Sequence, residues 1–365
     1  MAKLRVLFID DDAEGVRPAR QNLEEETYKC HCVSFPGFQA ALADFRPHIA
    51  IVDRMEGDAP LHENTGRRVF DEIWQHRFCP VIIYTAFPDD ERDDRESHPL
   101  VRYVTKGQNL DAFRAAIEEL APHAHAIENA EQHIHGQFAI ALRDISSYAA
   151  TAFDDPAQRL DVVVRQGRRR LAALMDEETM GKLASWEQYI YPPVSKCLML
   201  GDIIRLQNRA HDDPTAFCVI LTPSCDLVSE GDRKPKVEQV LVAKCCSPRA
   251  GIQKASLGRD KRDKQTEVVR GSLLSQGYFH SIVPFPALKG VIPALMADLK
   301  SLRLLPIADV SPAQSGNSNY ARVASLDSPF RELVSWAYLQ TACRPGLPDR
   351  DLDAWSKEIV EACGL

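Results

Sequence analysis

The chain has 365 residues, of which 45% are hydrophobic and 26% charged, so it is a globular protein of two or three domains rather than a disordered chain. No apolar run approaches the roughly 18 residues that a membrane-spanning helix needs, and the N-terminus has no signal-peptide pattern. The ten cysteines are irregularly spaced, unlike a secreted disulfide framework, so we expect a cytoplasmic protein with reduced thiols.

The net charge of −8 lies in the first 126 residues, which hold 15 Lys and Arg against 23 Asp and Glu. The remaining residues hold 29 of each sign. A neutral C-terminal part argues against a strongly basic nucleic-acid-binding protein. The local exception is the basic segment Arg249–Arg270, for which a solvated loop is the simplest interpretation.

Short apolar runs alternate with segments of helical periodicity between residues 3 and 121. The predicted strands are Leu4–Ile9, Cys30–Ser34, Ile49–Val52, Val81–Tyr84 and Arg102–Val104. The predicted helices are Ala13–Glu25, Phe38–Phe45, Arg67–His76 and Asp111–Leu120. This alternation predicts an α/β fold with a doubly wound parallel sheet of five strands. In such sheets the functional crevice lies at the carboxyl ends of the strands.

Helical periodicity continues from Ala126 to Ser185, and Pro192-Pro193 is a predicted boundary. The period then changes to two, which predicts the strands Gly201–Leu206, Phe217–Thr222, Val237–Lys244, Tyr278–Val283 and Arg303–Ile307. Two helices are predicted at Phe330–Thr341 and Asp351–Cys363. We therefore expect a first domain over residues 1–122, a helical linker or dimerisation segment over 123–192, and an α+β domain over 193–365 that could close into a small barrel.

Acidic, basic and hydroxyl side chains follow the predicted strands of the first domain. Asp10 and Asp11 follow the first strand, Asp53 the third, Thr85 the fourth and Lys106 the fifth. Three carboxylates in one crevice would raise one another's pKa unless a cation such as Mg²⁺ neutralised them. This set predicts a site for placing a phosphoryl group on a carboxylate. Asp53 would be the nucleophile, and Thr85 and Lys106 would bind the phosphoryl oxygens.

Residues 3–121 resemble the receiver domain of two-component response regulators. The residues that carry the resemblance are Ile9-Asp10-Asp11, Asp53, Thr85-Ala86, Tyr103 and Lys106. The resemblance implies a flavodoxin-like sheet, and Mg²⁺ held by Asp10, Asp11, Asp53 and the backbone carbonyl of Met55.

The resemblance also implies phosphorylation of Asp53 by a histidine kinase or a phosphotransfer protein, with Thr85 and Tyr103 as switch residues that reorient. The chain departs from the family pattern at Gly107, where proline is common, and in the long charged loops 54–64 and 87–99. These departures concern kinase pairing and switching rather than the pocket.

The C-terminal half has two predicted strands that end in thiols, and we recognise no family resemblance in it. Cys225, Cys245 and Cys246 could share a Zn²⁺ with His280, although their spacing matches no standard pair of ligands. Buried structural thiols are the simpler interpretation, since free cysteines are commonly buried. A third interpretation makes Cys225 a nucleophile with His280 as its base.

Three functions remain in competition. The first is a regulator that is switched by phosphorylation of Asp53 and acts through a protein output partner or a homodimer. The second is a receiver-controlled enzyme, a zinc hydrolase or nuclease built around Cys225, Asp226 and Cys245. The third is a DNA-binding regulator that uses Arg249–Arg270. We expect neither a nucleic-acid partner nor a membrane partner for the leading hypothesis.

Overall fold

The computed structural model describes residues 3–23, 27–53, 65–86, 98–107, 110–177, 181–229, 231, 233–255, 266–267, 269–314, 318–343 and 348–364. These residues belong to two compact units, Met1–Thr179 and Met180–Leu365, each with hydrophobic cores of its own. Within the described part of the chain, no helix has both the length and the apolar composition needed to cross a membrane.

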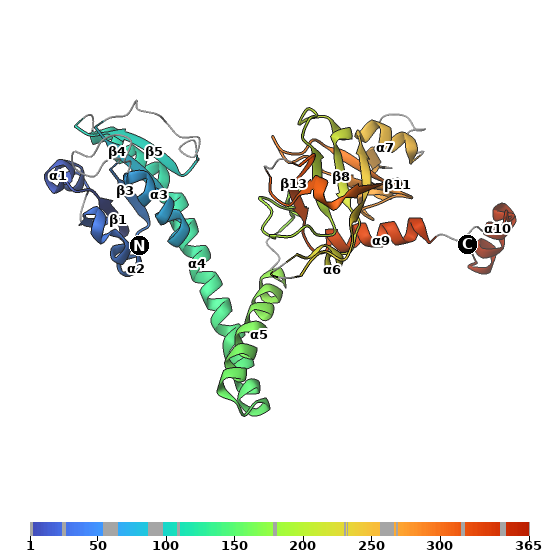
Figure 1. Ribbon diagram of the computed structural model, residues 1–365, viewed down its shortest axis with the longest axis horizontal. Coiled ribbons are helices and arrows are strands. Elements are labelled where there is room, and N and C mark those ends of the chain that lie inside the picture. Colours follow the sequence, from blue (N-terminus) through green and yellow to red (C-terminus); the bar gives the residue numbers. More distant parts are fainter. Residues whose placement is uncertain are drawn as a thin grey trace. The chain divides into compact units, whose positions relative to one another are not determined.

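Five parallel strands form the sheet of the first unit, in the spatial order β2-β1-β3-β4-β5 (Figure 1). They are β1 (Leu4–Ile9), β2 (Tyr28–Val33), β3 (Ile49–Val52), β4 (Val81–Thr85) and β5 (Val101–Thr105). Every residue of β3 and β4 is buried, as expected of parallel strands that are covered on both faces. This is the flavodoxin-like strand order, so the predicted fold of the first domain is confirmed.

Helices cover both faces of this sheet. Val6 and Phe8 of β1 belong to a core shared with α1 and α4, whereas Leu7 and Ile9 belong to a core shared with α2 and α3. Alternate residues of one strand thus reach opposite faces. The helices are α1 (Ala13–Gln21), α2 (Phe38–Phe45), α3 (Thr65–His76) and α4 (Leu110–Ala152), with a short 3₁₀ helix η1 at Phe35–Gly37.

The helix α4 is a single helix of 43 residues, where two separate helices were predicted. It runs through Pro122, although proline lacks an N–H and usually kinks or ends a helix. Leu120 and Ala124 on either side of Pro122 are both buried. We infer that this tertiary packing overrides the local signal, so that α4 continues well beyond the sheet (Figure 1).

The helix α5 (Pro156–Glu177) packs against the second half of α4 to form a helical hairpin (Figure 1). Small residues let the two helices approach closely, because Ala141 and Ala149 of α4 are completely buried. A Cβ atom added to Gly167 of α5 would lie only 2.7 Å from Leu142 Cδ2. A larger side chain at Gly167 would therefore have to displace Leu142.

The second unit contains an open, mostly antiparallel sheet in the order β10-β11-β9-β8-β7-β13-β12, with β6 paired to β13. Its strands are β6 (Tyr189–Ile190), β7 (Asp202–Leu206), β8 (Phe217–Ile220), β9 (Gln239–Cys246), β10 (Ile282–Phe285), β11 (Leu295–Pro306), β12 (Val310–Ser311) and β13 (Tyr320–Leu326). The prediction of an α+β fold is confirmed. The predicted closure into a barrel is wrong, because β10 and β12 each pair with only one neighbour among the described strands and so form the two edges of the sheet.

Two predicted strands of the second unit differ from the observed ones. The strand predicted at Tyr278–Val283 begins only at Ile282, because His280 has a left-handed φ of 54° that a strand does not accept. The strand predicted at Arg303–Ile307 is the end of the long strand β11, which contains a register shift between Asp298 and Leu302. The apolar alternation of β11 is interrupted at this shift, which hid its first half.

The second unit also contains helices (Figure 1). They are α6 (Ser224–Leu227), α7 (Pro248–Lys254), α9 (Phe330–Ala342) and α10 (Leu352–Ala362), with 3₁₀ helices η3 (Ser185–Gln188), η4 (Pro214–Ala216) and η6 (Ile307–Asp309) and a π-helical turn η5 (Val269–Leu274). Val334 and Ala337 of α9 complete the core on one face of the sheet. Leu198 and Leu227 complete the core on the other face.

A buried ion pair between Asp202 of β7 and Arg322 of β13 lies within the second unit. The side chains are 0% and 3% exposed, and Arg322 Nη1 lies 3.3 Å from Asp202 Oδ2. Arg322 also donates to the backbone carbonyls of Ser195 and Cys197. Ser325 Oγ donates to the other carboxylate oxygen of Asp202 at 2.6 Å. The pair therefore attaches the segment before β7 to the centre of the sheet.

Candidate functional site

The carboxyl ends of the parallel strands bring the predicted site residues of the first unit together. Asp10 follows β1, Asp53 follows β3 and Lys106 follows β5. Lys106 Nζ lies 2.6 Å from Asp10 Oδ2 and 2.7 Å from Asp53 Oδ2. All three side chains are at most 15% exposed, so these are charge-assisted contacts in a largely dry crevice.

Backbone hydrogen bonds hold these residues in place. The N–H of Asp10 donates to the carbonyl of Val33, and that of Asp53 donates to the carbonyl of Ile9, both at 3.0 Å. The N–H of Lys106 donates to the carbonyl of Thr85 at 2.8 Å. The strand pairing of the sheet thus continues one residue into the site, and it fixes the positions from which the side chains project.

The three consecutive aspartates that follow β1 have three different roles. Asp10 is buried and contacts Lys106. Asp11 is exposed, and its carboxylate accepts a hydrogen bond from the N–H of Phe35 at 3.3 Å. Asp12 caps α1 by accepting from the N–H groups of Glu14 and Gly15. Only one of the three carboxylates therefore enters the crevice, which reduces the repulsion among adjacent acids.

Burial is the largest single influence on the pKa values of Asp10 and Lys106 in the crevice. Burial is the largest cause of the raised pKa of Asp10, and the charge of Asp53 is the smallest. For Lys106, burial lowers the pKa, but hydrogen bonds and charges from Asp10 and Asp53 outweigh it and leave the pKa raised. Lys106 is therefore a positive charge held between the two carboxylates.

The two predicted switch residues lie in the interior of the unit. Thr85 is 1% exposed at the end of β4. Tyr103 of β5 is partly buried and packs against the core on the α2–α3 face of the sheet. A reorientation of either side chain would therefore change core packing as well as the crevice. Met55, the predicted source of a backbone ligand, lies outside the described residues.

The donors of this crevice fit Mg²⁺ in their chemistry. Mg²⁺ is bound through one or two carboxylates and keeps several waters, so it does not need a complete cage of protein ligands. Asp10 and Asp53 provide two carboxylates that meet at Lys106 Nζ. Among the described residues, no group of three or more His, Cys, Asp and Glu side chains could hold a metal ion by itself.

The four predicted zinc ligands of the second unit are Cys225, Cys245, Cys246 and His280. Within the described residues, they do not form a group that could hold a metal ion. Cys245 lies in the core, where burial raises the pKa of its thiol well above the ordinary value. Cys246 donates to the carbonyl of Met296, whereas Cys225 and His280 are exposed. The basic segment Arg249–Arg270 lies partly outside the described residues.

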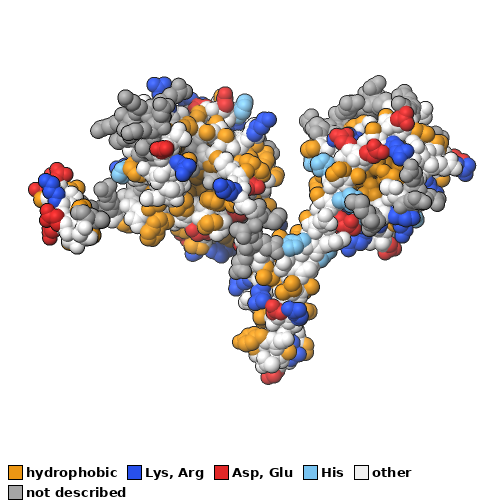
Figure 2. Space-filling model, turned by 180° about the vertical axis from the view of Figure 1, so that it is seen from behind, with side chains coloured by type: hydrophobic (Ala, Val, Ile, Leu, Met, Phe, Trp, Pro, Cys, Tyr) orange, Lys and Arg blue, Asp and Glu red, His pale blue; other side chains and the backbone are white. Residues whose placement is uncertain are grey.

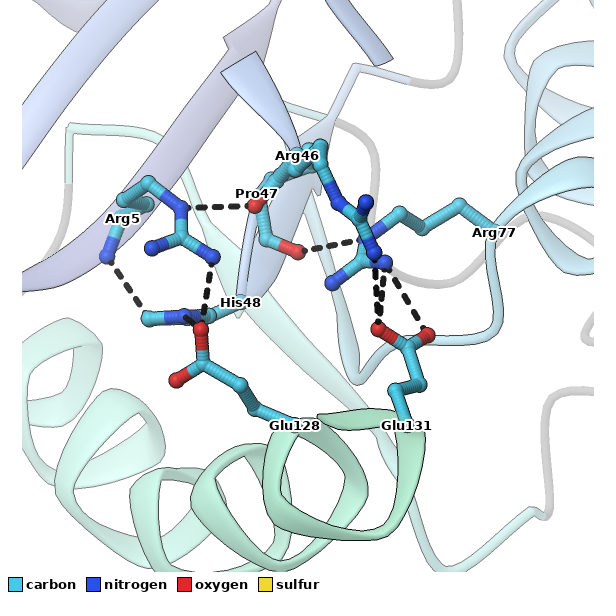
Figure 3. Close-up of polar contacts among 7 residues, drawn as sticks. All are labelled: Arg5, Arg46, Pro47, His48, Arg77, Glu128 and Glu131. Carbon is cyan, nitrogen blue, oxygen red and sulfur yellow. Dashed lines mark hydrogen bonds and ion pairs between the residues drawn. The ribbon is translucent and has the colours of Figure 1, made fainter. Parts of the chain in front are cut away.

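A polar cluster at the opposite edge of the sheet was not predicted. We call it the edge clamp, and it consists of Glu128 and Glu131 of α4 with Arg5, Arg46, His48 and Arg77 (Figure 3). Glu128 accepts a hydrogen bond from Arg5 Nη2 at 3.0 Å, and its carboxylate lies 2.9 Å from His48 Nε2. His48 Nδ1 in turn accepts from the backbone N–H of Arg5 at 3.1 Å.

The second half of the edge clamp is centred on Glu131. Arg77 Nη1 lies 2.7 Å and 3.0 Å from its two carboxylate oxygens, and Arg46 Nη2 lies 3.4 Å away. Arg77 also donates to the carbonyl of Pro47, and its side chain is only 10% exposed (Figure 3). The clamp thus attaches α4 to the amino-terminal edge of the sheet, beyond Pro122.

The sequence contained a signal for this clamp. Arg5 lies at the start of β1, Arg46 and His48 lie just before β3, and Arg77 lies just before β4. The amino ends of parallel strands meet at one edge, so basic residues at the amino ends of three strands predict a positive edge. The acidic partners Glu128 and Glu131 could not be found, because the helix after the last strand was predicted to end at Leu120.

No family model matches the chain, and no curated protein matches it. Several solved structures that are similar to the chain are receiver domains of response regulators, and the likeness covers about the N-terminal third of the chain.

One of these structures is the CheY-like response regulator receiver domain protein of Methanospirillum hungatei, at 19% identity and a TM-score of 0.30, covering 34% of this chain and 98% of that one. A second is the signal receiver domain of a putative Luxo repressor protein of Vibrio parahaemolyticus, at 20% identity and a TM-score of 0.30, covering 36% and 98%. A third is the receiver domain of a modulated diguanylate cyclase of Desulfovibrio desulfuricans, at 22% identity and a TM-score of 0.28, covering 34% and 98%.

Proposed function

We propose that the first unit is a phosphoryl-accepting receiver in a two-component signalling pathway, with Asp53 as the acceptor. The observation that supports this most is the convergence of Asp10, Asp53 and Lys106 within 2.7 Å at the carboxyl edge of a flavodoxin-like sheet. A crevice of this composition can bind a dianionic phosphoryl group only with its carboxylates neutralised, and Lys106 supplies one of the positive charges required.

The donor in this proposal is a phosphohistidine of a histidine kinase or a phosphotransfer protein. A carboxylate oxygen of Asp53 attacks the phosphorus, a P–O bond forms, and the P–N bond to the histidine breaks. The released imidazole takes up a proton from solvent. Lys106 transfers its contact from the Asp53 carboxylate to a phosphoryl oxygen, and Thr85 donates its hydroxyl to another.

The residues that would hold Mg²⁺ are Asp10, Asp11 and Asp53, with the carbonyl of Met55. When bound, the ion would supply the positive charge that offsets repulsion between these carboxylates and the incoming phosphoryl oxygens. Asp11 now accepts from the N–H of Phe35, so we expect its carboxylate to turn toward the crevice on metal binding.

The proposed output is a protein–protein contact made by the hairpin of α4 and α5. α4 starts at Leu110, just after Lys106, and passes under the sheet with Phe113 and Ile117 completely buried. It is held again at the opposite edge by the edge clamp (Figure 3). A displacement at Lys106 would therefore move α4 as one body rather than bend it locally.

The phosphorylation experiment uses the full chain with acetyl phosphate and Mg²⁺. Intact-mass spectrometry should detect one added phosphoryl group, and peptide mapping should place it on Asp53. Asp53→Asn should abolish the modification, and Lys106→Ala should reduce its yield. Asp44→Asn, an exposed carboxyl on α2, is the matched control and should behave as wild type. Modification of another residue, or none, would contradict the proposal.

The output is tested separately by hydrogen exchange and light scattering of the phosphorylated chain, with Asp53→Asn as the control. We expect exchange across residues 110–177 to change on phosphorylation and a homodimer or a captured protein partner to form. Unchanged exchange and unchanged mass, with Asp53 demonstrably occupied, would leave the receiver intact and reject the hairpin as its output.

A further inference from the structure

The C-terminal helix α10 has an apolar face that nothing covers in the described part of the chain. Leu352, Trp355, Ile359 and Val360 are 47–59% exposed, and their spacing places them on one side of the helix. No residue of α10 is buried. A helix of 11 residues is marginally stable in water by itself, so a surface that packs against this face would stabilise it substantially.

The rest of α10 is acidic. Asp351 caps the helix by accepting from the N–H of Ala354, and the helix carries three further acids, Asp353, Glu358 and Glu361, against a single Lys357. Figure 2 shows acidic and hydrophobic side chains together on this segment. The helix is therefore complementary to a surface that is apolar in its centre and basic at its margin.

The same unit contains a pocket of about 710 Å³ whose lining includes two lysines and the exposed Leu339. It lies among the ends of α7 and α9, the turn before β10, and β11. Its described lining contains no carboxylate: it consists of Lys254, Ala255, Tyr278, His280, Ser281, Lys300, Leu339, Gln340, Thr341 and Cys343. Leu339 is 51% exposed, and Trp336, one turn earlier on α9, is 55% exposed.

A carboxylate that is not among the lining residues, Asp298, holds one of the two lysine side chains of this pocket. Asp298, which is 8% exposed, accepts from Lys254 Nζ at 2.6 Å and from the backbone N–H of Lys300 at 3.1 Å. The bond from Asp298 is the largest cause of the raised pKa of Lys254, which keeps this side chain charged. The side chain of Lys300 is exposed, and its charge faces no acid among the described lining residues.

We propose that α10 docks on this pocket of its own chain. Its apolar face would cover Leu339 and Tyr278, and its acids would face Lys254 and Lys300. The short connection between the pocket and α10 supports an intramolecular contact. Cys343 itself lines the pocket, and only the nine residues 343–351 separate the end of α9 from the start of α10. They reach at most ~30 Å, which gives α10 an effective concentration on the order of millimolar at the pocket.

The test uses the full chain and two readouts, hydrogen exchange of α10 and the alkylation rate of Cys343. Docking should slow exchange in α10 about tenfold or more relative to an undocked helix, and it should shield Cys343. Trp355→Ser should remove the protection and increase Cys343 alkylation several-fold, whereas Lys357→Ser on the same helix should not. Because α10 buries no residue, neither change endangers the fold. Exposed Cys225 is the internal standard for alkylation.

A charge reversal tests the pocket side. Lys300→Glu should weaken the protection of α10, and Lys289→Glu, at another exposed lysine of the unit, should leave it unchanged. The protection should be constant over a hundredfold range of protein concentration. Unprotected α10 in the wild type would overturn the proposal. Protection that increases with concentration would overturn it too, because the occupant would then be a second copy of the chain.

Discussion

At the scale of single residues, the edge clamp depends on the protonation of one histidine. His48 Nδ1 accepts a hydrogen bond from Arg5, and Nε2 contacts the carboxylate of Glu128, so the neutral ring with its proton on Nε2 satisfies both. A second proton on Nδ1 would break the bond to Arg5. Burial is the largest cause of the lowered pKa of His48, with Arg5 and His125 acting in the same direction and Glu128 opposing.

This sets a pH dependence for the first unit. The pKa of His48 is lower in the folded state than its ordinary value of 6.5, so the unfolded chain binds the proton first as the pH falls. The contribution of His48 to stability is thus complete above pH 6.5 and is lost as the pH falls toward the folded pKa. Between pH 7.5 and pH 5.5, the melting temperature should fall less for His48→Gln than for the wild type or for the control variant His133→Gln.

A second residue-scale prediction concerns Arg322. Arg322→Met leaves Asp202 buried without its cation, which should lower the free energy of unfolding by about 3–5 kcal/mol. Burial already raises the pKa of Asp202, and loss of Arg322 raises it further. A raised carboxyl pKa favours the folded state at low pH, so the destabilisation should be larger at pH 8 than at pH 5.

The control for this prediction is the double variant Asp202→Asn with Arg322→Met. Without an ionisable group at residue 202, the double variant should lose the contribution of this carboxyl, so its difference in stability between pH 5 and pH 8 should be smaller than that of Arg322→Met. A destabilisation of Arg322→Met that is the same at both pH values would show that lost packing, rather than an unpaired charge, is the cause.

At the scale of elements, the hairpin of α4 and α5 contains two glycines in opposite environments. A Cβ atom at Gly136 of α4 would meet no atom within 4 Å, so Gly136→Ala should stabilise the helix by up to about 1 kcal/mol. At Gly167, the same change must displace Leu142, so Gly167→Ala should stabilise the hairpin less than Gly136→Ala does. The larger change Gly167→Leu should destabilise the hairpin. Urea unfolding of the three variants checks both the order and the sign.

The elements also show how much of the fold could be predicted. The strands β1 and β3 and the helix α2 have the predicted bounds, because polar residues follow the two short apolar runs and the apolar residues of α2 have helical spacing. The position of the crevice was predictable as well, because the acids directly follow strands whose carboxyl ends meet at one edge of the sheet. The continuity of α4 through Pro122 was not predictable, because it depends on the edge clamp, whose partners are more than 50 residues apart in sequence. The open sheet of the second unit was hidden by the register shift in β11.

At the scale of the whole molecule, the two units have separate cores and should unfold separately. Calorimetry of the full chain should therefore resolve two transitions. Gly136→Ala should move only the transition of the first unit, and Arg322→Met only that of the second. A single transition that responds to both substitutions would show that the two units unfold cooperatively.

The position of β13 between β7 and β12 has a consequence for synthesis on the ribosome. All parts of the first sheet emerge before the second unit begins, so the first unit can fold while translation continues. In the second unit, Ser325 bonds to Asp202, 123 residues earlier. At roughly 5–20 residues per second, this separation corresponds to a delay of about 6–25 s. During that interval β7 emerges without its partner β13, so the nascent second unit exposes an open strand edge that chaperones can bind.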